Sequence, residues 1–366
     1  MEKIRVGILF GGKSCEHEIS LLSAKSVIEA LDLDKYEPVL ISIDKTGVWH
    51  VRDALNYLMN SENPKQIRLQ GEQGNVAIVP KEEGNALVNM SSTASAAVDV
   101  IFPVLHGTYG EDGTVQGLLK MAGIPFVGAD VLGSAIGMDK DVAKRLLKEA
   151  GIPIGKFIVV RSFEKEKLSY EHFVKELGLP FFIKPANAGS SVGVSKIKTE
   201  EDFQRGMREA FSYDRKVIVE EFILGREIEC SVLGNDHPIA SLPGEVIPEH
   251  EFYSYEAKYL DENGARFEIP VFLPEDILKK AQEMAVQTFK VLCCEGMARV
   301  DFFLTEKGEL FVNEINTIPG FTKISMYPKL WQVSGVPYKV LLDRLISLAL
   351  ERRNREVEIQ TAYKIT

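Results

Sequence analysis

The sequence has few cysteines, and their spacing is not that of a disulfide-rich or zinc-binding protein. It contains four in 366 residues, Cys15, Cys230, Cys293 and Cys294, two of them adjacent and none in a CxxC spacing. This set suits neither a disulfide framework nor a zinc site. We therefore expect buried thiols in the reducing cytoplasm.

The sequence also lacks long apolar runs and an excess of positive charge. No stretch approaches the roughly 18 apolar residues of a membrane span, and the first residues lack a signal-peptide layout. The formal net charge is -10, which gives no general attraction to nucleic acid or an anionic membrane. We predict a cytoplasmic protein with small-molecule partners, in which local cations hold any anionic substrate.

Length and apolar pattern predict a multidomain α/β protein. With 366 residues and 45% apolar content, the chain can build two or three domains with separate cores. Apolar stretches at 4–10, 39–43 and 98–105, with a helical pattern at 21–31, predict a parallel α/β sheet. The polar stretch 56–96 is expected to elaborate the surface, and a helix at 114–122 comes before the end of the domain near residue 130.

The rest of the chain predicts two further domains. A helix at 139–150 begins a small α+β unit, in which one helix at 170–177 accompanies strands at 157–160, 181–184, 193–196 and 217–221. Beyond it, strands alternate with helices at 274–292 and 337–350, and the charged residues from 352 are expected to be peripheral. The predicted domains are 1–130, 131–221 and 222–366.

The most informative stretch, RVDFFLTEKGELFVNEIN from Arg299, has the pattern of a β-hairpin. If 307–308 is a two-residue turn, Asp301 opposes Glu314 and Arg299 opposes Asn316. Opposed residues share a face, so one face carries a cation and three oxygen ligands. These are either polar residues on the wet side of an ordinary hairpin or ligands of Mg²⁺ that holds phosphates. Repulsion between the two carboxylates favours the metal site.

Two glycine-containing segments resemble phosphate loops, and we reject the first. GILFGGKS from Gly7 matches GxxxxGK[ST], but its first glycine lies inside the predicted strand, and Glu16 and Glu18 follow where they would repel phosphate. Glu18 is either a plain partner of the helix dipole or a ligand for a cationic group such as a substrate ammonium.

The second segment, the Gly/Ser loop at 184–193, links two predicted strands and contains small and hydroxyl residues. It is either a polar hairpin or a loop that folds over phosphates, with Lys184 supplying charge. Acids at the end of strand 217–221 either face water or accept hydrogen bonds from adenine and ribose. His106 follows strand 98–105 at the sheet edge where α/β proteins hold ligands, and is either structural or functional.

Seven segments together resemble one family, in order and over nearly the whole chain. They are FGGKSCEHEIS from Phe10, LHGTYGEDG from Leu105, MDK from Met138, the Gly/Ser loop, YEAKY from Tyr255, ARVD from Ala298 and NEINTIPGFTKIS from Asn313. This combination resembles the D-alanine-D-alanine ligases of the ATP-grasp superfamily. The resemblance implies an N-terminal parallel α/β domain followed by a two-part ATP-grasp fold that grips ATP between two sheets. Within the Gly/Ser loop, Ala188 departs from relatives that often have a larger or charged residue there.

The resemblance also implies the site residues. ATP would be bound by Lys140, Lys184, Ser190, Ser191, Glu220, Glu221, Phe222, Ile223, Glu227 and Lys258, and two Mg²⁺ (or Mn²⁺) ions by Asp301, Glu314 and Asn316. Substrate would be bound by Glu18 at the first ammonium, His106 near the first carboxylate, Lys258 and Ser325 at the second carboxylate, and Gly320 with Arg299 at the oxyanion. The implied catalytic set is Glu18, Ser190, Arg299, Tyr259 and His106, in which Tyr259, Ser190 and Glu18 form hydrogen bonds that tie a mobile loop to the site.

The implied function is ATP-dependent joining of two D-alanine molecules through D-alanyl phosphate, for peptidoglycan precursors, by a homodimer. A related ligase that uses D-lactate or D-serine is the nearest alternative, and Lys258-Tyr259 favours D-alanine. A nucleotide-binding regulatory protein is disfavoured by Arg299 and the three metal ligands. Another ATP-grasp carboxylate-amine ligase is disfavoured by Glu18 and His106.

Overall fold

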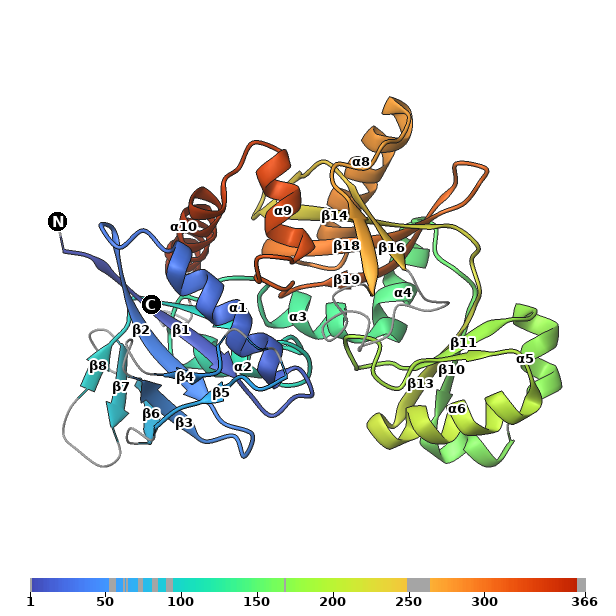
Figure 1. Ribbon diagram of the computed structural model, residues 1–366, viewed down its shortest axis with the longest axis horizontal. Coiled ribbons are helices and arrows are strands. Elements are labelled where there is room, and N and C mark those ends of the chain that lie inside the picture. Colours follow the sequence, from blue (N-terminus) through green and yellow to red (C-terminus); the bar gives the residue numbers. More distant parts are fainter. Residues whose placement is uncertain are drawn as a thin grey trace, which may run out of the picture.

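The protein is described here by a computed structural model covering residues 2–52, 57–61, 63, 65–71, 75–80, 85–89, 95–167, 169–248 and 264–360. Its first region is a four-stranded sheet with strand order β3-β2-β1-β9 (Figure 1). The elements are β1 (Ile4–Gly11), α1 (His17–Ala30), β2 (Tyr36–Ile43), β3 (Trp49–Arg52) and β9 (Val100–Val104). β1 pairs in parallel with both β2 and β9, which confirms the predicted parallel sheet.

Alternating side chains let this sheet bury both faces. Ile8 and Phe10 on β1 pack in a core with α1 and α10 (Tyr338–Val357), whereas Leu9 packs on the opposite face with α2 (Thr114–Met121). The loops after β1 and β9 therefore leave the same edge of the sheet. Ser14 Oγ donates to the carbonyl of His106 at 2.6 Å and joins the two loops.

The polar stretch predicted at 56–96 contains short strands in its described part. They are β4 (Leu58–Met59), β5 (Arg68–Leu69), β6 (Val76–Pro80), β7 (Asn85–Asn89) and β8 (Ser95–Ala97). The last three pair as an antiparallel sheet, so the stretch is more ordered than its composition predicts.

The central region is an antiparallel sheet of order β10-β13-β11-β12. Its elements are β10 (Phe157–Arg161), the 3₁₀ helix η1 (Ser162–Lys167), α5 (Tyr170–Leu177), β11 (Phe181–Pro185), β12 (Ser195–Ile197), α6 (Glu200–Tyr213) and β13 (Lys216–Glu221). Phe181 and Ile183 pack under α5 and α6, so the alternate residues Phe182 and Lys184 face the other way. We did not predict α6, although Thr199 and Asp202 form a capping box at its start.

The C-terminal sheet has the order β17-β16-β14-β18-β19, with β15 paired to β14. Its strands and covering helix are β14 (Arg226–Gly234), β15 (Ile239–Ala240), β16 (Gly244–Pro248), β17 (Ala265–Glu268), α8 (Glu275–Val291), β18 (Gly296–Leu304) and β19 (Leu310–Asn316). Val300 and Phe302 pack with α8 in one core, which leaves Arg299 and Asp301 on the opposite face.

Helices between and after the sheets join their cores. α3 (Val131–Met138) and α4 (Lys140–Glu149) precede β10, and Ala143 and Leu147 of α4 pack in the core of the C-terminal sheet. α10 packs against the N-terminal sheet, whereas α9 (Met326–Val333) packs against α10 and β14 (Figure 1). Among the described residues, no helix combines the length and apolarity that a membrane crossing requires.

The prediction of a peripheral segment from Arg352 is wrong at Arg352 itself, which is buried, whereas residues 353–360 are exposed or half-buried and α10 ends at Val357. Arg352 is 5% exposed and donates to the carbonyls of Gly128 at 2.6 Å and Phe126 at 2.7 Å. Its guanidinium lies 4.5 Å from the ring centroid of Phe126. A charged side chain therefore fixes the end of α10 to the segment after α2.

Candidate functional site

A pocket lies between the polar faces of the central and C-terminal sheets. Among the described residues, all those predicted to bind ATP line it, and they are Lys140, Lys184, Ser190, Ser191, Glu220, Glu221, Phe222, Ile223 and Glu227. Phe182 and Phe303 add apolar surface from the two facing sheets. The pocket therefore combines cations and hydroxyls at one part with aromatic surface that suits a planar base.

Buried lysines and acids pair along the wall of this pocket. Glu220 lies between Lys184, which it contacts directly, and Lys144, whose Nζ is 3.0 Å from Glu220 Oε1. Burial opposes ionisation of Glu220, but the two ammonium groups lower its pKa below the ordinary value. Burial lowers the pKa of Lys144, which the sequence did not single out. The Glu220 carboxylate thus forms ion pairs with two lysines. Its predicted contact with the nucleotide stays a prediction.

Lys140 joins the Gly/Ser loop to the C-terminal sheet. Its Nζ donates to the carbonyl of Ala188 at 2.8 Å and lies 3.3 Å from Glu314 Oε2. Lys184 donates to Asn313 Oδ1 at 3.4 Å. Two cations from different elements therefore meet beside the carboxylates of the hairpin, as an anionic ligand such as a triphosphate requires.

The hairpin brings together the four residues predicted to share a face. Arg299 pairs with Asn316 and Asp301 with Glu314, as predicted. The predicted two-residue turn is wrong, however. Leu304 pairs with Leu310, so the turn is longer by one residue, with Gly308 at a positive φ of 76°. A bulge between Asp301 and Phe302 compensates for the extra residue.

Arg299 lies between two carboxylates on this face. Its Nε and Nη2 each donate to Asp301 at 2.7 Å, and Nε lies 3.0 Å from Glu229 Oε2. Glu229 faces Asp301 across β14 and β18 and was missed by the sequence analysis. The guanidinium is thereby held in place beside the candidate metal ligands.

The surroundings of Asp301, Glu314 and Asn316 bear on their predicted part as metal ligands. The Oδ1 atom of Asn316 is buried and has no hydrogen-bond partner within the described part of the chain, which is costly unless a ligand satisfies it. Asp301 and Glu314 are directly opposed. Among the described residues there is no group of three or more His, Cys, Asp and Glu side chains arranged for a metal, so the predicted set depends on the amide oxygen of Asn316 as its third ligand. Two carboxylates and an amide suit Mg²⁺.

A second pocket adjoins the first at Ser190 and Glu314, which line both. It contains His106, Arg299, Gly320 and Ser325 of the predicted substrate residues. An added Cβ at Gly320 would lie 2.7 Å from Ser325 Oγ, so a larger residue there would require the Ser325 side chain to move. A nucleotide site and a smaller polar site thus share Ser190 and Glu314, and Arg299 lines the smaller one.

Glu16, and not Glu18, reaches this second pocket. Glu16 is 6% exposed and accepts a hydrogen bond from Ser190 Oγ across the two domains. Glu18 instead forms an ion pair with Lys45, whose Nζ lies 2.6 Å from Glu18 Oε1. The Lys45 side chain is 66% exposed. The predicted hydrogen bond between Ser190 and Glu18 is therefore wrong, because residues two apart on a helix point in nearly opposite directions.

Comparisons with known proteins now place the chain. The profile of the D-ala D-ala ligase N-terminus matches residues 5–129, and that of the D-ala D-ala ligase C-terminus matches residues 146–347. The D-alanine--D-alanine ligase of Oceanobacillus iheyensis is 56% identical over 98% of this chain and 99% of its own. The chain belongs to the D-alanine-D-alanine ligase family. D-alanine--D-alanine ligase A of Escherichia coli K12 is 52% identical over 99% of this chain and 100% of its own.

Solved structures of ligases share the fold. The D-alanine-D-alanine ligase from Coxiella burnetii has a TM-score of 0.84 and 38% identity, and covers 98% of this chain and 97% of its own. The VanG D-Ala:D-Ser ligase from Enterococcus faecalis has a TM-score of 0.81 and 36% identity, and covers 95% of this chain and all of its own. The fold is therefore ATP-grasp, and membership of the family implies use of ATP.

Glu111 and Glu16 lie close enough in the site for their charges to interact. Glu111 Oε2 accepts the Gly107 N-H at 2.7 Å, and its Oε1 is buried without a hydrogen-bond partner. Burial and the neighbouring Glu16 raise the pKa of Glu111 well above its ordinary value. The sequence contains Glu111 in the loop we noted for its glycines, but nothing there indicated its burial.

His106 is held as a neutral imidazole. Its Nδ1 lies 3.0 Å from the carbonyl of Ile318, which can only accept, so Nδ1 donates and Nε2 accepts from Ser23 Oγ at 3.1 Å. Burial lowers the pKa of His106 to about 4. Both ring nitrogens are occupied, which favours a structural part for His106 in the wall of the ligase site.

Lys258 and Tyr259 lie outside the described residues, and so does the rest of 249–263. Their predicted contacts with ATP, the second substrate and Ser190 stay predictions.

Proposed function

We propose that this protein joins two D-alanine molecules into D-alanyl-D-alanine, with conversion of ATP to ADP and phosphate, for peptidoglycan precursors. The observation that supports this most directly is the pair of adjoining pockets that meet at Ser190 and Glu314. One has the cations and aromatic surface for ATP, and the other has buried carboxylates for a substrate ammonium.

In the first step, a carboxylate oxygen of one D-alanine attacks the γ-phosphoryl group of ATP, and ADP leaves. Lys140 and Lys184 bind phosphate oxygens and offset their charge, while the Gly/Ser loop excludes water. Glu16 binds the ammonium of this D-alanine and orients its carboxylate toward ATP. The product of the step is an acyl phosphate.

In the second step, the amine of another D-alanine attacks the acyl carbonyl, and phosphate leaves from the tetrahedral intermediate. Arg299 and the Gly320 N-H stabilise the negative charge that develops on the carbonyl oxygen. Ser325 and Lys258 bind the second carboxylate. Holding both substrates in one cavity lowers the entropic part of the barrier.

Asp301, Glu314 and Asn316 are the residues that would hold two Mg²⁺ (or Mn²⁺) ions, and the unsatisfied amide oxygen of Asn316 supports this assignment. When bound, the ions would neutralise charge on the phosphoryl oxygens of ATP. We further propose a homodimer that acts in the cytoplasm, where the buried thiols of Cys230 and Cys294 stay reduced.

The experiment is an assay of purified protein with ATP, Mg²⁺ and D-alanine. ADP, phosphate and D-alanyl-D-alanine are expected in equal amounts, and absence of D-alanine-dependent phosphate release would refute the proposal. The likeness to a D-Ala:D-Ser ligase makes D-serine the main alternative for the second position. Competition with D-serine and D-lactate decides between them, since a mixed product would identify the related ligase.

A further inference from the structure

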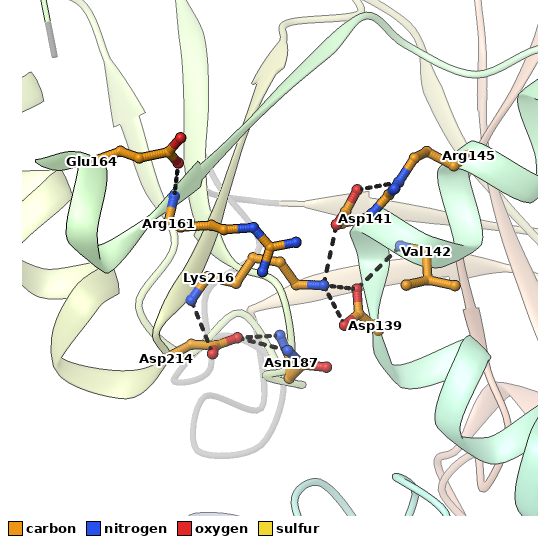
Figure 2. A network of polar contacts seen from close by, with 9 residues as sticks. All are labelled: Asp139, Asp141, Val142, Arg145, Arg161, Glu164, Asn187, Asp214 and Lys216. Carbon is orange, nitrogen blue, oxygen red and sulfur yellow. Dashed lines mark hydrogen bonds and ion pairs between the residues drawn. The ribbon is translucent and has the colours of Figure 1, made fainter. Parts of the chain in front are cut away.

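A cluster of charged side chains outside the ligase site connects the central sheet to the start of α4. Lys216 Nζ donates to both carboxylate oxygens of Asp139, at 2.7 and 2.5 Å, and to Asp141 Oδ2 at 3.2 Å (Figure 2). The side chains of Lys216, Asp139 and Asp141 are 13%, 18% and 1% exposed. We call these three residues the Lys216 clamp.

The charges around the clamp explain why Lys216 turns toward α4. Lys216 is directly opposed to Arg161 on β10, and like charges in that position repel. Burial raises the pKa of Asp141, but Arg145 and Lys216 together lower it below the ordinary value. Arg145 holds Asp141 through two bonds of 2.7 and 2.6 Å, whereas Lys216 is the cation that holds Asp139 in Figure 2.

The clamp acts on a segment that carries a phosphate-binding candidate. Asp139 caps α4 by accepting the Val142 N-H at 3.1 Å, and the next residue is Lys140. Backbone hydrogen bonds connect the same segments as the clamp. Lys140 N donates to Ala186 O at 3.0 Å, and Ala186 N donates to Lys216 O at 2.9 Å. Lys216 is therefore connected to Lys140 both through its side chain and through the first residues of the Gly/Ser loop.

A second contact fixes the start of this loop from the same turn. Asp214 Oδ2 accepts from the backbone and the side-chain nitrogens of Asn187, at 2.8 and 2.9 Å, while Asp214 Oδ1 accepts from Lys216 N at 3.1 Å (Figure 2). Beyond Asn187, the carbonyl of Ala188 accepts from Lys140 Nζ. The segment 214–216 thus contacts both the start of α4, which carries Lys140, and the first residues of the Gly/Ser loop.

We propose that Lys216 is a positioning residue for the ligase reaction: through Asp139 it sets Lys140 and the first residues of the Gly/Ser loop in the geometry that meets the nucleotide phosphates. Lys216 itself contacts no reacting atom. The inference rests on the proposed function, because it assigns a phosphate-binding part to Lys140. It concerns the phosphate end of ATP and leaves the adenine end and D-alanine unaffected.

The test compares binding of two ligands that differ in their phosphates. Dissociation constants for Mg²⁺ with β,γ-methylene-ATP, and for adenosine, are measured by calorimetry on wild-type protein and on Lys216→Met. Loss of the clamp should weaken the triphosphate about tenfold, the cost of a small misplacement of one charged contact, and adenosine by less than about twofold. The KM for D-alanine should stay within about twofold.

Three further variants separate positioning from general loosening. Lys216→Arg restores the positive charge and should bring triphosphate binding to within about threefold of wild type. Asp139→Asn keeps a helix cap but removes the charge, so it should reproduce the Lys216→Met result, and the double variant should be no worse. Arg205→Met removes an exposed ion pair with Asp202 in the same region and should change neither constant.

Unchanged triphosphate binding in Lys216→Met would overturn the proposal, and so would an equal loss for adenosine or failure of Lys216→Arg to restore binding. If Lys216→Met does not fold, Asp139→Asn decides by the same criteria. The ligase assay on wild-type protein is separate from these measurements. A wild-type protein that binds nucleotide but makes no dipeptide would refute the proposed function and leave the binding comparison intact.

Discussion

Replacing Glu16 by glutamine removes the carboxylate that the proposed function assigns to the substrate ammonium, while keeping the shape of the side chain. Glu18→Gln is a matched control, since Glu18 lies in the first turn of α1 and Glu16 immediately precedes that helix. Glu16 is buried against Ser190, whereas Glu18 pairs with the exposed Lys45. Glu16→Gln therefore removes a charge from the second pocket, whereas Glu18→Gln removes one from an ion pair outside it.

The size of the effect follows from these surroundings. A hydrogen-bonded contact to a charged group in a buried site contributes about 1.5–3 kcal/mol. Since about 1.4 kcal/mol corresponds to a factor of ten in rate, Glu16→Gln should lower kcat/KM for D-alanine about 10- to 150-fold. The ion pair of Glu18 belongs to the exposed class that contributes about 0.2–1 kcal/mol, and then only to stability. Glu18→Gln should thus keep kcat/KM within about twofold of wild type.

The assay is steady-state phosphate release with D-alanine varied at saturating ATP. Binding of Mg²⁺ with ADP is measured alongside it, because Glu16 is not expected to change nucleotide affinity by more than about twofold. A large loss in Glu18→Gln with little in Glu16→Gln would refute the assignment. Equal losses of D-alanine and ADP binding in Glu16→Gln would show that the variant disturbs the whole cavity.

Three further variants test other parts of the molecule. Asn316→Ala should raise the Mg²⁺ concentration for half-maximal rate about tenfold or more, because it removes one of the oxygen ligands; an unchanged Mg²⁺ titration would contradict the metal assignment. Arg352→Met should lower the melting temperature, with a loss of about 2–4 kcal/mol from two buried charged hydrogen bonds, and a change of less than about 0.5 kcal/mol would show that α10 is held by apolar packing alone. The pKa of His106 is lowered to about 4, so the unfolded chain takes up a proton between about pH 4 and its ordinary value near 6.5 while the folded protein does not, and stability should fall as the pH falls through this window. His106→Gln should flatten that fall in thermal melts, and an equally steep fall in the variant would assign the pH dependence to other groups.

Helical periodicity held a signal for Glu16 that we did not use. Glu16 lies on one stripe with Ser20, Ser23 and Val27, all buried. Glu18 shares its stripe with Leu22, Lys25 and Glu29, none of them fully buried. A helix that covers a sheet buries one stripe, so small and apolar residues at spacings of three and four indicate which acid faces inward. The resemblance alone offered two acids two residues apart, and dipole arguments do not distinguish them.

Contacts between residues far apart in the chain could not be predicted from the sequence. The raised pKa of Glu111 depends in part on the charge of Glu16 from another loop, and Glu220 lies between Lys144 and Lys184 from different elements. Each of these acids looks like an ordinary surface residue in its local sequence. What the sequence did predict were contacts set by strand alternation, such as the shared face of Asp301 and Glu314 in the hairpin, because alternation depends only on a period of two.

The hairpin shows how a correct register can follow from an incorrect turn. Leu304 opposite Leu310 implies that Asp301 would face Asn313 if both strands continued regularly. Ile315, which packs in the core, would then take the place of Asn316 opposite Arg299. The bulge at Asp301 and Phe302 restores the pairing that a two-residue turn would have produced, and leaves both Asn313 and Glu314 outside the core. Asn313 thereby contacts Lys184 of the central sheet, while Glu314 lies beside Lys140. The additional residue is thus the reason that a single strand presents one side chain to the nucleotide pocket and the next to the candidate metal site.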